Sequence, residues 1–178
     1  MIYGITGYVG SGKDTVVDFL LQQGFEHASL SDEIRLELKK NNIPETREAL
    51  ISCGNNLRHQ FGADILAKRA LSKIKNHDRV VLSSIRNIEE INFLKSQPEF
   101  KFIFVEAPQY TRFARIIKRN RIGDTKTFAE FVAKEKQEES ADKNAQQMHR
   151  VKDYADIIIN NNSTLENLYK QINERILI

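Results

Sequence analysis

The chain has 178 residues, of which 40% are hydrophobic and 29% charged, and a net charge of +3. This length predicts one domain with a full core, and so small a charge does not favour a nucleic-acid binder. The single cysteine, Cys53, excludes an intramolecular disulfide. No basic leader precedes the first predicted strand, and no apolar run approaches the roughly 20 residues of a membrane span. We therefore expect a cytoplasmic protein without membrane contact.

Five short runs rich in β-branched and aromatic residues are predicted as strands. In chain order they are Ile2–Thr6, Phe25–Leu30, Arg79–Ser84, Lys101–Glu106 and Asp156–Asn160. Three of them are almost continuously hydrophobic, which is typical of parallel strands covered on both faces.

Helical patterns separate these runs. They cover Thr15–Gln22, Glu33–Lys40, two helices within Glu45–Ile74 that break near Gly62, Ile88–Ser96, Tyr110–Arg121, a polar helix from Phe128, and a last helix. The last helix opens with a predicted capping box, Ser163–Glu166, and its predicted apolar stripe is Leu165, Leu168, Ile172 and Ile176. The alternation predicts an α/β fold with a doubly wound, five-stranded parallel sheet in one domain, 1–178.

The pattern G-x-x-x-x-G-K runs from Gly7 to Lys13, between a predicted strand and a predicted helix. This is the context of a phosphate-binding loop, although a glycine-rich turn without a ligand is the alternative. Glycines allow left-handed dihedrals that turn backbone N–H groups toward phosphate oxygens, and the helix N-terminus adds partial positive charge. We expect ATP to be bound by Gly7, Gly10, Ser11, Gly12, Lys13, Asp14 and Thr15. Lys13 would reach the terminal phosphates.

The form G-S-G-K-x-T, with Asp14 after the lysine and Thr15 one place later, resembles the phosphate loops of nucleoside monophosphate kinases such as adenylate kinase. The letters SGKDT resemble phage deoxynucleoside monophosphate kinases in particular. Three later segments, SLSDEIR, GNNLRHQFGADILAKR and SSIRNIEEINFL, and the C-terminal DIIINNNSTLENLYKQI extend the resemblance over the whole chain. The chain is thus similar to small P-loop kinases: archaeal adenylate-kinase-related proteins, the kinase-like domain of some deoxycytidylate deaminases and, more distantly, dephospho-coenzyme A kinase. The resemblance implies a P-loop NTPase fold, a helical lid at about residues 112–145, and ATP and Mg²⁺ as cofactors.

Asp32 follows the second predicted strand, at the edge where open α/β sheets bind ligands. Two interpretations of the residues are equally good. Asp32 meets an acceptor hydroxyl or magnesium, or else Ser31 caps a helix whose first turn contains Asp32 and Glu33. The resemblance favours the first and makes Asp32 a catalytic carboxylate. It also implies a substrate-binding set of Asp32, Arg35, Arg58 and Arg86.

The third predicted strand ends in VVLSSIRN, where the resembling kinases have an aspartate in place of Ser83. A serine can orient a magnesium-bound water but contributes no charge. We expect magnesium near Thr15, Asp32 and Ser83. The missing carboxylate makes slow or absent phosphotransfer the main alternative.

Arg112, Arg115 and Arg119 recur at helical spacing and are predicted to share a face, opposite Phe113, Ile116 and Ile117. Arginines on a closing lid stabilise the charge that develops in phosphoryl transfer. The resemblance makes Arg115, Arg119 and Arg121 lid candidates, with catalytic roles for Arg115 and Arg119. A solvated basic face is the alternative.

Three consecutive asparagines, Asn160, Asn161 and Asn162, come at the end of the last predicted strand. The resembling kinases place this loop beside the adenine ring, and a polar turn is an equally good interpretation. We assign Asn160, with Arg115, to the ATP site. The four histidines, His27, His59, His77 and His149, show no metal-ligand spacing and are expected at the surface or in satisfied core positions.

Together these patterns predict an ATP-dependent phosphotransferase whose acceptor is a nucleoside or deoxynucleoside monophosphate, with dephospho-coenzyme A as second choice. A regulatory ATP-binding module with little kinase activity is the rival, because of Ser83. Nucleic-acid binding by the basic helix is weaker, since no aromatic platform accompanies it. The expected partner is a small nucleotide substrate, and a monomer or a homodimer fits equally.

Overall fold

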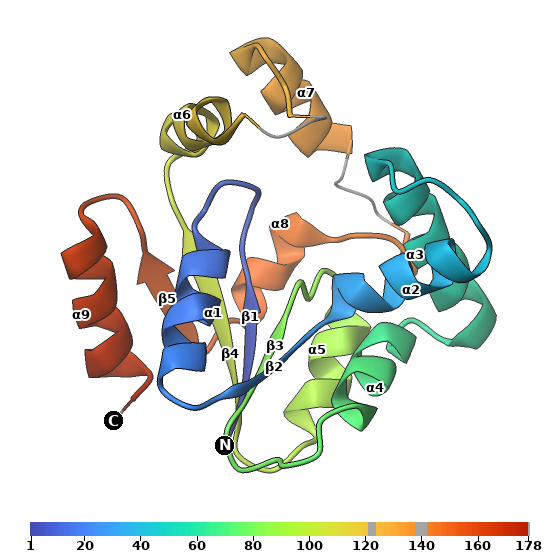
Figure 1. Ribbon diagram of the computed structural model, residues 1–178, viewed down its shortest axis with the longest axis horizontal. Coiled ribbons are helices and arrows are strands. Elements are labelled where there is room, and N and C mark those ends of the chain that lie inside the picture. The colour runs from blue at the N-terminus through green and yellow to red at the C-terminus, as the bar shows by residue number, and fades with distance from the viewer. Residues whose placement is uncertain (121–123, 138–141, 178) are drawn as a thin grey trace.

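A five-stranded, fully parallel sheet in the order β2-β3-β1-β4-β5 forms the centre of the molecule (Figure 1). The computed structural model describes residues 1–120, 124–137 and 142–177. Its strands are β1 Ile2–Thr6, β2 Glu26–Ser29, β3 Val80–Ser83, β4 Phe100–Glu106 and β5 Ile157–Asn160. The predicted α/β fold with five parallel strands is confirmed.

Helices connect the strands and cover both faces of the sheet. They are α1 Lys13–Gln22, α2 Leu30–Lys40, α3 Arg47–Phe61, α4 Ile65–Ser72, α5 Ile88–Lys95, α6 Gln109–Arg119, α7 Phe128–Gln137, α8 Met148–Val151 and α9 Leu165–Arg175, with a 3₁₀ turn at Lys152–Tyr154. The predicted break lies at Gly62, which ends α3 with a φ of 101°. The α8 helix was not predicted because four residues are too few to show a helical period. Within the described residues, no helix is both long and apolar enough to cross a membrane.

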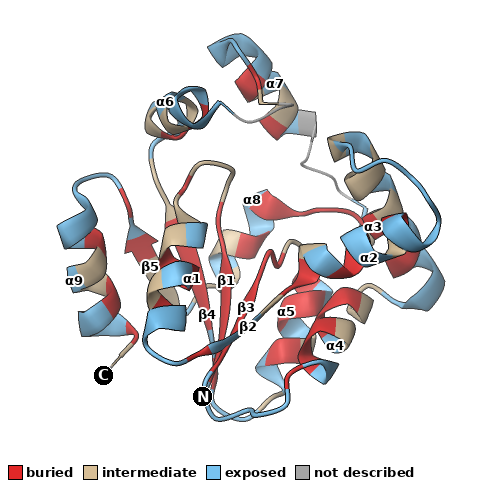
Figure 2. Ribbon diagram, in the orientation of Figure 1, coloured by how far each residue is buried: buried red, intermediate tan, exposed pale blue. Residues whose placement is uncertain are grey.

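Burial follows the position of each strand in the sheet. All residues of β1 and β3 are buried, because each has a strand on both sides and helices on both faces (Figure 2). The edge strand β2 begins with exposed Glu26 and His27, which explains its weak hydrophobic pattern.

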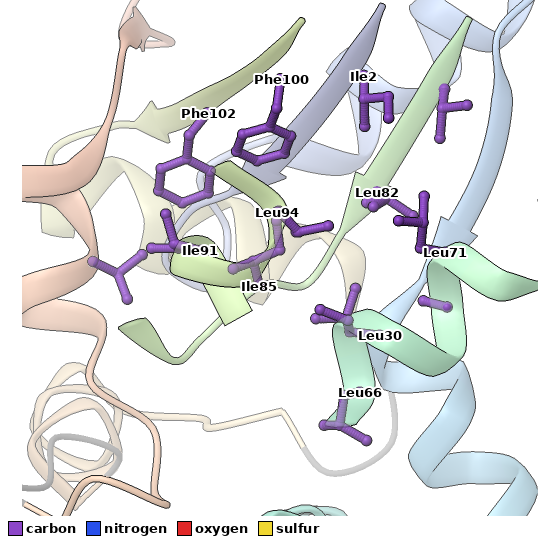
Figure 3. Close-up of a cluster of buried hydrophobic side chains, with 14 of the residues drawn as sticks. Ile2, Leu30, Leu66, Leu71, Leu82, Ile85, Ile91, Leu94, Phe100 and Phe102 are labelled. Atoms are coloured by element: carbon purple, nitrogen blue, oxygen red, sulfur yellow. The ribbon is translucent and has the colours of Figure 1, made fainter. Parts of the chain in front are cut away.

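Two hydrophobic layers sandwich the sheet. One layer packs β1, β3 and β4 residues such as Leu82 and Phe102 against α2, α4, α5 and α8 (Figure 3). The other packs Ile5 and Val81 against α1 and α9. Successive strand residues alternate between the layers, because side chains of a strand point to opposite faces in turn. The sheet is therefore doubly wound, as predicted.

Two helix starts differ from the prediction. Thr164, not Ser163, caps α9: its side chain accepts a hydrogen bond from the Asn167 amide at 3.3 Å. Leu165 lies outside the apolar stripe and is 53% exposed. Ser31 lies inside α2, whose N-cap is Ser29, so the interpretation of Ser31 as a helix cap is wrong. In both cases a nearby hydroxyl residue gives the same pattern, so the pattern alone does not identify the residue at which the helix starts.

Candidate functional site

The glycine-rich loop connects β1 to α1, as predicted. Gly10 and Gly12 have φ values of 80° and 91°, in the left-handed region that favours glycine. Gly7 serves a different purpose, because its φ is not positive. A Cβ at Gly7 would lie 2.3 Å from the Val105 carbonyl oxygen, so only glycine allows this approach to β4.

An unsatisfied hydroxyl lies inside this loop. Ser11 is fully buried, and its Oγ has no hydrogen-bond partner among the described residues. A buried hydroxyl without a partner is costly, and a phosphate oxygen is the kind of group that would satisfy it. Together with the positive φ values and the N-terminus of α1, this fits the loop to a polyphosphate anion.

The Lys13 ammonium pairs with the carboxylate of its neighbour Asp14. Asp14 lies in the first turn of α1, where negative charge is favourable, and two thirds of its side chain is exposed. A bound polyphosphate would compete for the same ammonium with a larger negative charge.

Helix α6 lies directly on the loop. A Cβ at Gly10 would come 2.6 Å from the backbone oxygen of Arg112. Figure 1 shows α6 and α7 together above the connection between β1 and α1. Helix α6 and the phosphate loop therefore pack without space for a side chain between them.

This contact makes a matched pair of glycine substitutions informative. Gly24 also has a positive φ, 84°, but a Cβ there meets nothing within 4 Å. We expect Gly24→Ala to cost about 1 kcal/mol of unfolding free energy, the left-handed cost alone. Gly10→Ala should cost at least about 1 kcal/mol more, because backbone atoms must shift. Urea denaturation of both variants measures this, and equal losses would contradict the close packing.

Arg112 does not lie on a solvated face but fastens α6 to its surroundings. It is 5% exposed, and its guanidinium binds both carboxylate oxygens of Glu135 on α7. It also donates to the Val9 carbonyl at 3.3 Å and lies between the Tyr8 and Phe131 rings, 4.9 and 5.4 Å from their centroids. Arg112 thus joins the phosphate loop to both α6 and α7.

Arg115 lies against the backbone of the loop. Its guanidinium donates to the backbone oxygens of Ser11 at 3.3 Å and Asn161 at 2.8 Å. Burial lowers the pKa of Arg115, and no carboxylate pairs with it within the described part of the chain. A partly buried cation that is paired only with carbonyl groups favours an anion nearby.

Asn161 contacts the glycine-rich loop, whereas Asn160 bonds to α9. The Asn161 side chain donates to the Ser11 carbonyl at 2.8 Å, and its Nδ2 would lie 2.1 Å from a Cβ at Gly12. Asn160 instead exchanges two hydrogen bonds between its backbone and the Gln171 amide, at 3.1 and 2.9 Å. An ATP contact by Asn160 stays a prediction.

The rest of α6 departs from the predicted two faces. Ile116 is buried but Ile117 is 45% exposed, so they do not share an apolar side. Arg119 forms two hydrogen bonds with Asp124, at 2.7 and 2.8 Å, and these bonds raise its pKa. Arg121 lies outside the described residues.

Asp32 and Arg35 pair with each other on the exposed side of α2, at 2.9 Å, and Arg35 also binds Glu45 at 2.8 Å. All three line a groove of about 460 Å³ with Leu36, Leu38, Lys39 and Ile43. The predicted acceptor-side carboxylate and arginine are therefore adjacent, in a concave part of the surface.

Arg58 lies in the interior. It is 3% exposed and pairs at 2.8 Å with Glu90, which is fully buried. The second Glu90 oxygen accepts from the Arg86 and Asn87 amides at 2.9 and 3.0 Å, which caps α5. This burial argues against the predicted direct contact between Arg58 and a substrate. The half-buried Arg86 donates to Gln146 Oε1 at 2.8 Å.

Ser83 ends β3 and is hydrogen-bonded to His27 on β2, with 2.8 Å between Oγ and Nε2. Ser83 is the register partner of Ile5, which belongs to the layer under α1. His27 is exposed as a whole residue, but the burial of part of its side chain lowers its pKa. Lys13 lowers this pKa further, while Asp32, Asp14 and Asp18 raise it. These influences place His27 among the charges of the phosphate loop and of α2, although its sequence context is that of an ordinary histidine.

Comparisons with known proteins agree with this architecture. A family model described as an AAA domain matches residues 4–143. A UPF0200 protein from Thermococcus sibiricus is 34% identical over 143 residues, 76% of this chain and 75% of that protein. The chain belongs to the AAA domain family and to the UPF0200 family. Another UPF0200 member, from Pyrococcus abyssi, is 33% identical over 145 residues, 78% of each chain.

This UPF0200 chain is also similar in fold to a kinase of known structure. Shikimate kinase from Bacteroides thetaiotaomicron superposes with a TM-score of 0.61 and 16% identity, covering 100% of this chain and 99% of that one. An identity this low shows a similar fold and does not show a shared activity. The P-loop kinase-like fold is confirmed, while the nucleoside monophosphate kinase type stays a proposal.

The residues predicted to lie near magnesium carry oxygen donors, which magnesium prefers as ligands. Thr15 and Ser83 offer hydroxyl groups and Asp32 a carboxylate. Within the described residues, no group of three or more His, Cys, Asp or Glu side chains could hold a metal by itself. Magnesium would thus depend on phosphate oxygens for several of its ligands, as is usual where it binds with a nucleotide.

Proposed function

We propose that this UPF0200 chain transfers the γ-phosphoryl group of ATP to a small nucleotide-like acceptor, in the first instance a nucleoside or deoxynucleoside monophosphate. The observation that carries the proposal is the phosphate loop, with the unsatisfied Ser11 hydroxyl inside it and Lys13 at the start of α1. The P-loop kinase-like fold supports it. So does the resemblance of residues 11–15 to nucleoside monophosphate kinases.

Phosphoryl transfer depends on positioning and on charge stabilisation more than on covalent chemistry by the protein. Lys13 would bind the transferred phosphoryl group, and Arg115 and Arg119 would stabilise charge from the lid side. Asp32 would accept a hydrogen bond from the acceptor. Magnesium, when bound near Thr15, Ser83 and Asp32, would supply positive charge to the phosphates. The packing of α6 against the loop would limit access of water, a competing acceptor.

The residues predicted to bind the acceptor are consistent with an anionic substrate, but they do not identify it. Arg35 lies in the groove beside Asp32, and Arg86 is half-buried at the start of α5. Either guanidinium could bind a phosphate or carboxylate group. Dephospho-coenzyme A is the second candidate acceptor. A regulatory ATPase is the rival function, favoured by the uncharged Ser83 at the end of β3.

An acceptor panel tests the proposal. ADP formation is measured with ATP and Mg²⁺ alone, and then with each nucleoside monophosphate, each deoxynucleoside monophosphate, dephospho-coenzyme A, and shikimate for the structural neighbour. Stimulation by one nucleotide of at least about tenfold over the acceptor-free rate supports a kinase. If only shikimate stimulates ADP formation, the proposed nucleotide acceptor is wrong. ADP formation that does not depend on any acceptor would favour the regulatory ATPase. Calorimetry that detects no ATP binding would overturn both functions.

A further inference from the structure

The end of β3 contains a hydrogen-bonded pair that the proposed chemistry does not yet use. Ser83 Oγ and His27 Nε2 are 2.8 Å apart, and Ser83 is 4% exposed. The two residues come from neighbouring parallel strands, β3 and β2, and project on the side of the sheet covered by α1. The phosphate loop begins on the next strand, directly after Thr6.

A serine hydroxyl can replace a carboxylate at this position only if its hydrogen is directed elsewhere. Water in the hydration shell of magnesium donates hydrogen bonds, so a group that orients it must accept them. A carboxylate is an acceptor only, whereas a serine hydroxyl also carries a hydrogen that competes with the water. An imidazole nitrogen that accepts this hydrogen leaves the lone pairs of the serine oxygen available.

We propose that His27 is a positioning residue that accepts the Ser83 hydroxyl hydrogen and thereby turns Ser83 into an acceptor toward the magnesium–nucleotide complex. The two residues together then accept hydrogen bonds from magnesium-bound water, as a single aspartate at the end of β3 would. This inference rests on the proposed function, because it requires magnesium and ATP at the loop.

Nε2 is the ring nitrogen of His27 that faces the Ser83 hydroxyl, at 2.8 Å. A neutral ring with its hydrogen on Nδ1 has Nε2 free as an acceptor. The neighbouring hydroxyl groups of Ser29 and Ser84 bond to each other at 3.2 Å and do not compete for the ring.

Calorimetry with a non-hydrolysable ATP analogue tests the pair without requiring turnover. The quantity measured is the ratio of the dissociation constants without and with Mg²⁺. We expect His27→Ala and Ser83→Ala each to reduce this ratio about tenfold, the value of one hydrogen bond to a charged site. His27→Gln, whose Oε1 can accept the same hydrogen, should stay within about threefold of the unchanged protein.

Two further variants separate positioning from a general effect on folding. His77→Ala is the matched control, because His77 lies before β3, at the opposite end of that strand, and bonds the Ile74 carbonyl. It should leave the ratio unchanged. In a Ser83→Asp background, His27→Ala should change the ratio by less than about threefold, since a carboxylate has no hydrogen to redirect.

The outcomes are distinguishable. If the unchanged protein binds the analogue with Mg²⁺ but His27→Ala binds equally well, the role of His27 is overturned and the proposed function stands. The role of His27 is overturned as well if His27→Ala weakens binding equally in both backgrounds, because that points to a structural effect. If the unchanged protein does not bind the analogue at all, the proposed function itself fails.

Discussion

Lys13→Met is expected to lower the phosphotransfer rate by about 10²-fold to 10³-fold, the usual loss when one stabilising donor to a developing charge is removed. Lys13 lies at the first position of α1, beside two glycines with positive φ, and no other lysine lies in the loop. The methionine side chain has a similar length and no charge, so packing should change little. The rate is measured as ADP formation with the best acceptor of the panel.

A change at Asp14 tests the same lysine in the opposite direction, because the Asp14 carboxylate pairs with Lys13 in the structure. Asp14→Asn removes the competing carboxylate and should strengthen ATP binding by about twofold to fivefold, within the value of an exposed ion pair. Lys13→Arg keeps the charge and should retain more activity than Lys13→Met. If Lys13→Met keeps more than a third of the rate, the loop is not the site of transfer.

Arg58→Met is expected to destabilise the fold by about 3–5 kcal/mol, because it leaves the Glu90 carboxylate buried without a countercharge. Glu90 is fully buried and Arg58 is 3% exposed, so water cannot replace the lost partner without a structural change. The free energy of unfolding from urea denaturation measures the loss. A change of less than about 1 kcal/mol would contradict the conclusion that the fold depends on this buried ion pair.

The double variant Arg58→Met with Glu90→Gln tests the cause of that loss. The introduced glutamine would keep an oxygen for the Arg86 and Asn87 amides at the start of α5 without a buried charge. We expect the double variant to be more stable than Arg58→Met alone. Lys170→Met breaks the exposed pair with Glu174 and should cost less than about 1 kcal/mol.

Local sequence predicted most of the fold. The five apolar runs gave all five strands, and the break at Gly62 separated α3 from α4. The loop motif was predicted in its correct place because glycine, lysine and flanking patterns are adjacent in the chain. Element ends were less exact: α1 begins two residues before the predicted Thr15.

Only the tertiary structure shows which side chains contact the loop and which are paired elsewhere. Nothing in three consecutive asparagines distinguishes Asn161, which reaches Ser11 across 150 positions because of the register of β5 with β4. Glu135 belongs to the helix that was predicted only as polar, but α7 packs on α6 and buries Glu135 against Arg112. Arg58 looked like a phosphate ligand until its place beside Glu90 was known.

The sequence by itself therefore determined the phosphate loop, the parallel sheet and the order of the elements, because short-range patterns encode backbone conformation and burial. The packed structure alone decided which side chains stand beside the loop and which are occupied elsewhere. His27 shows the difference: it lies 56 positions from Ser83, and only the pairing of β2 with β3 brings the two together. Contacts of this kind depend on strand order and register, which a pattern along one chain does not contain.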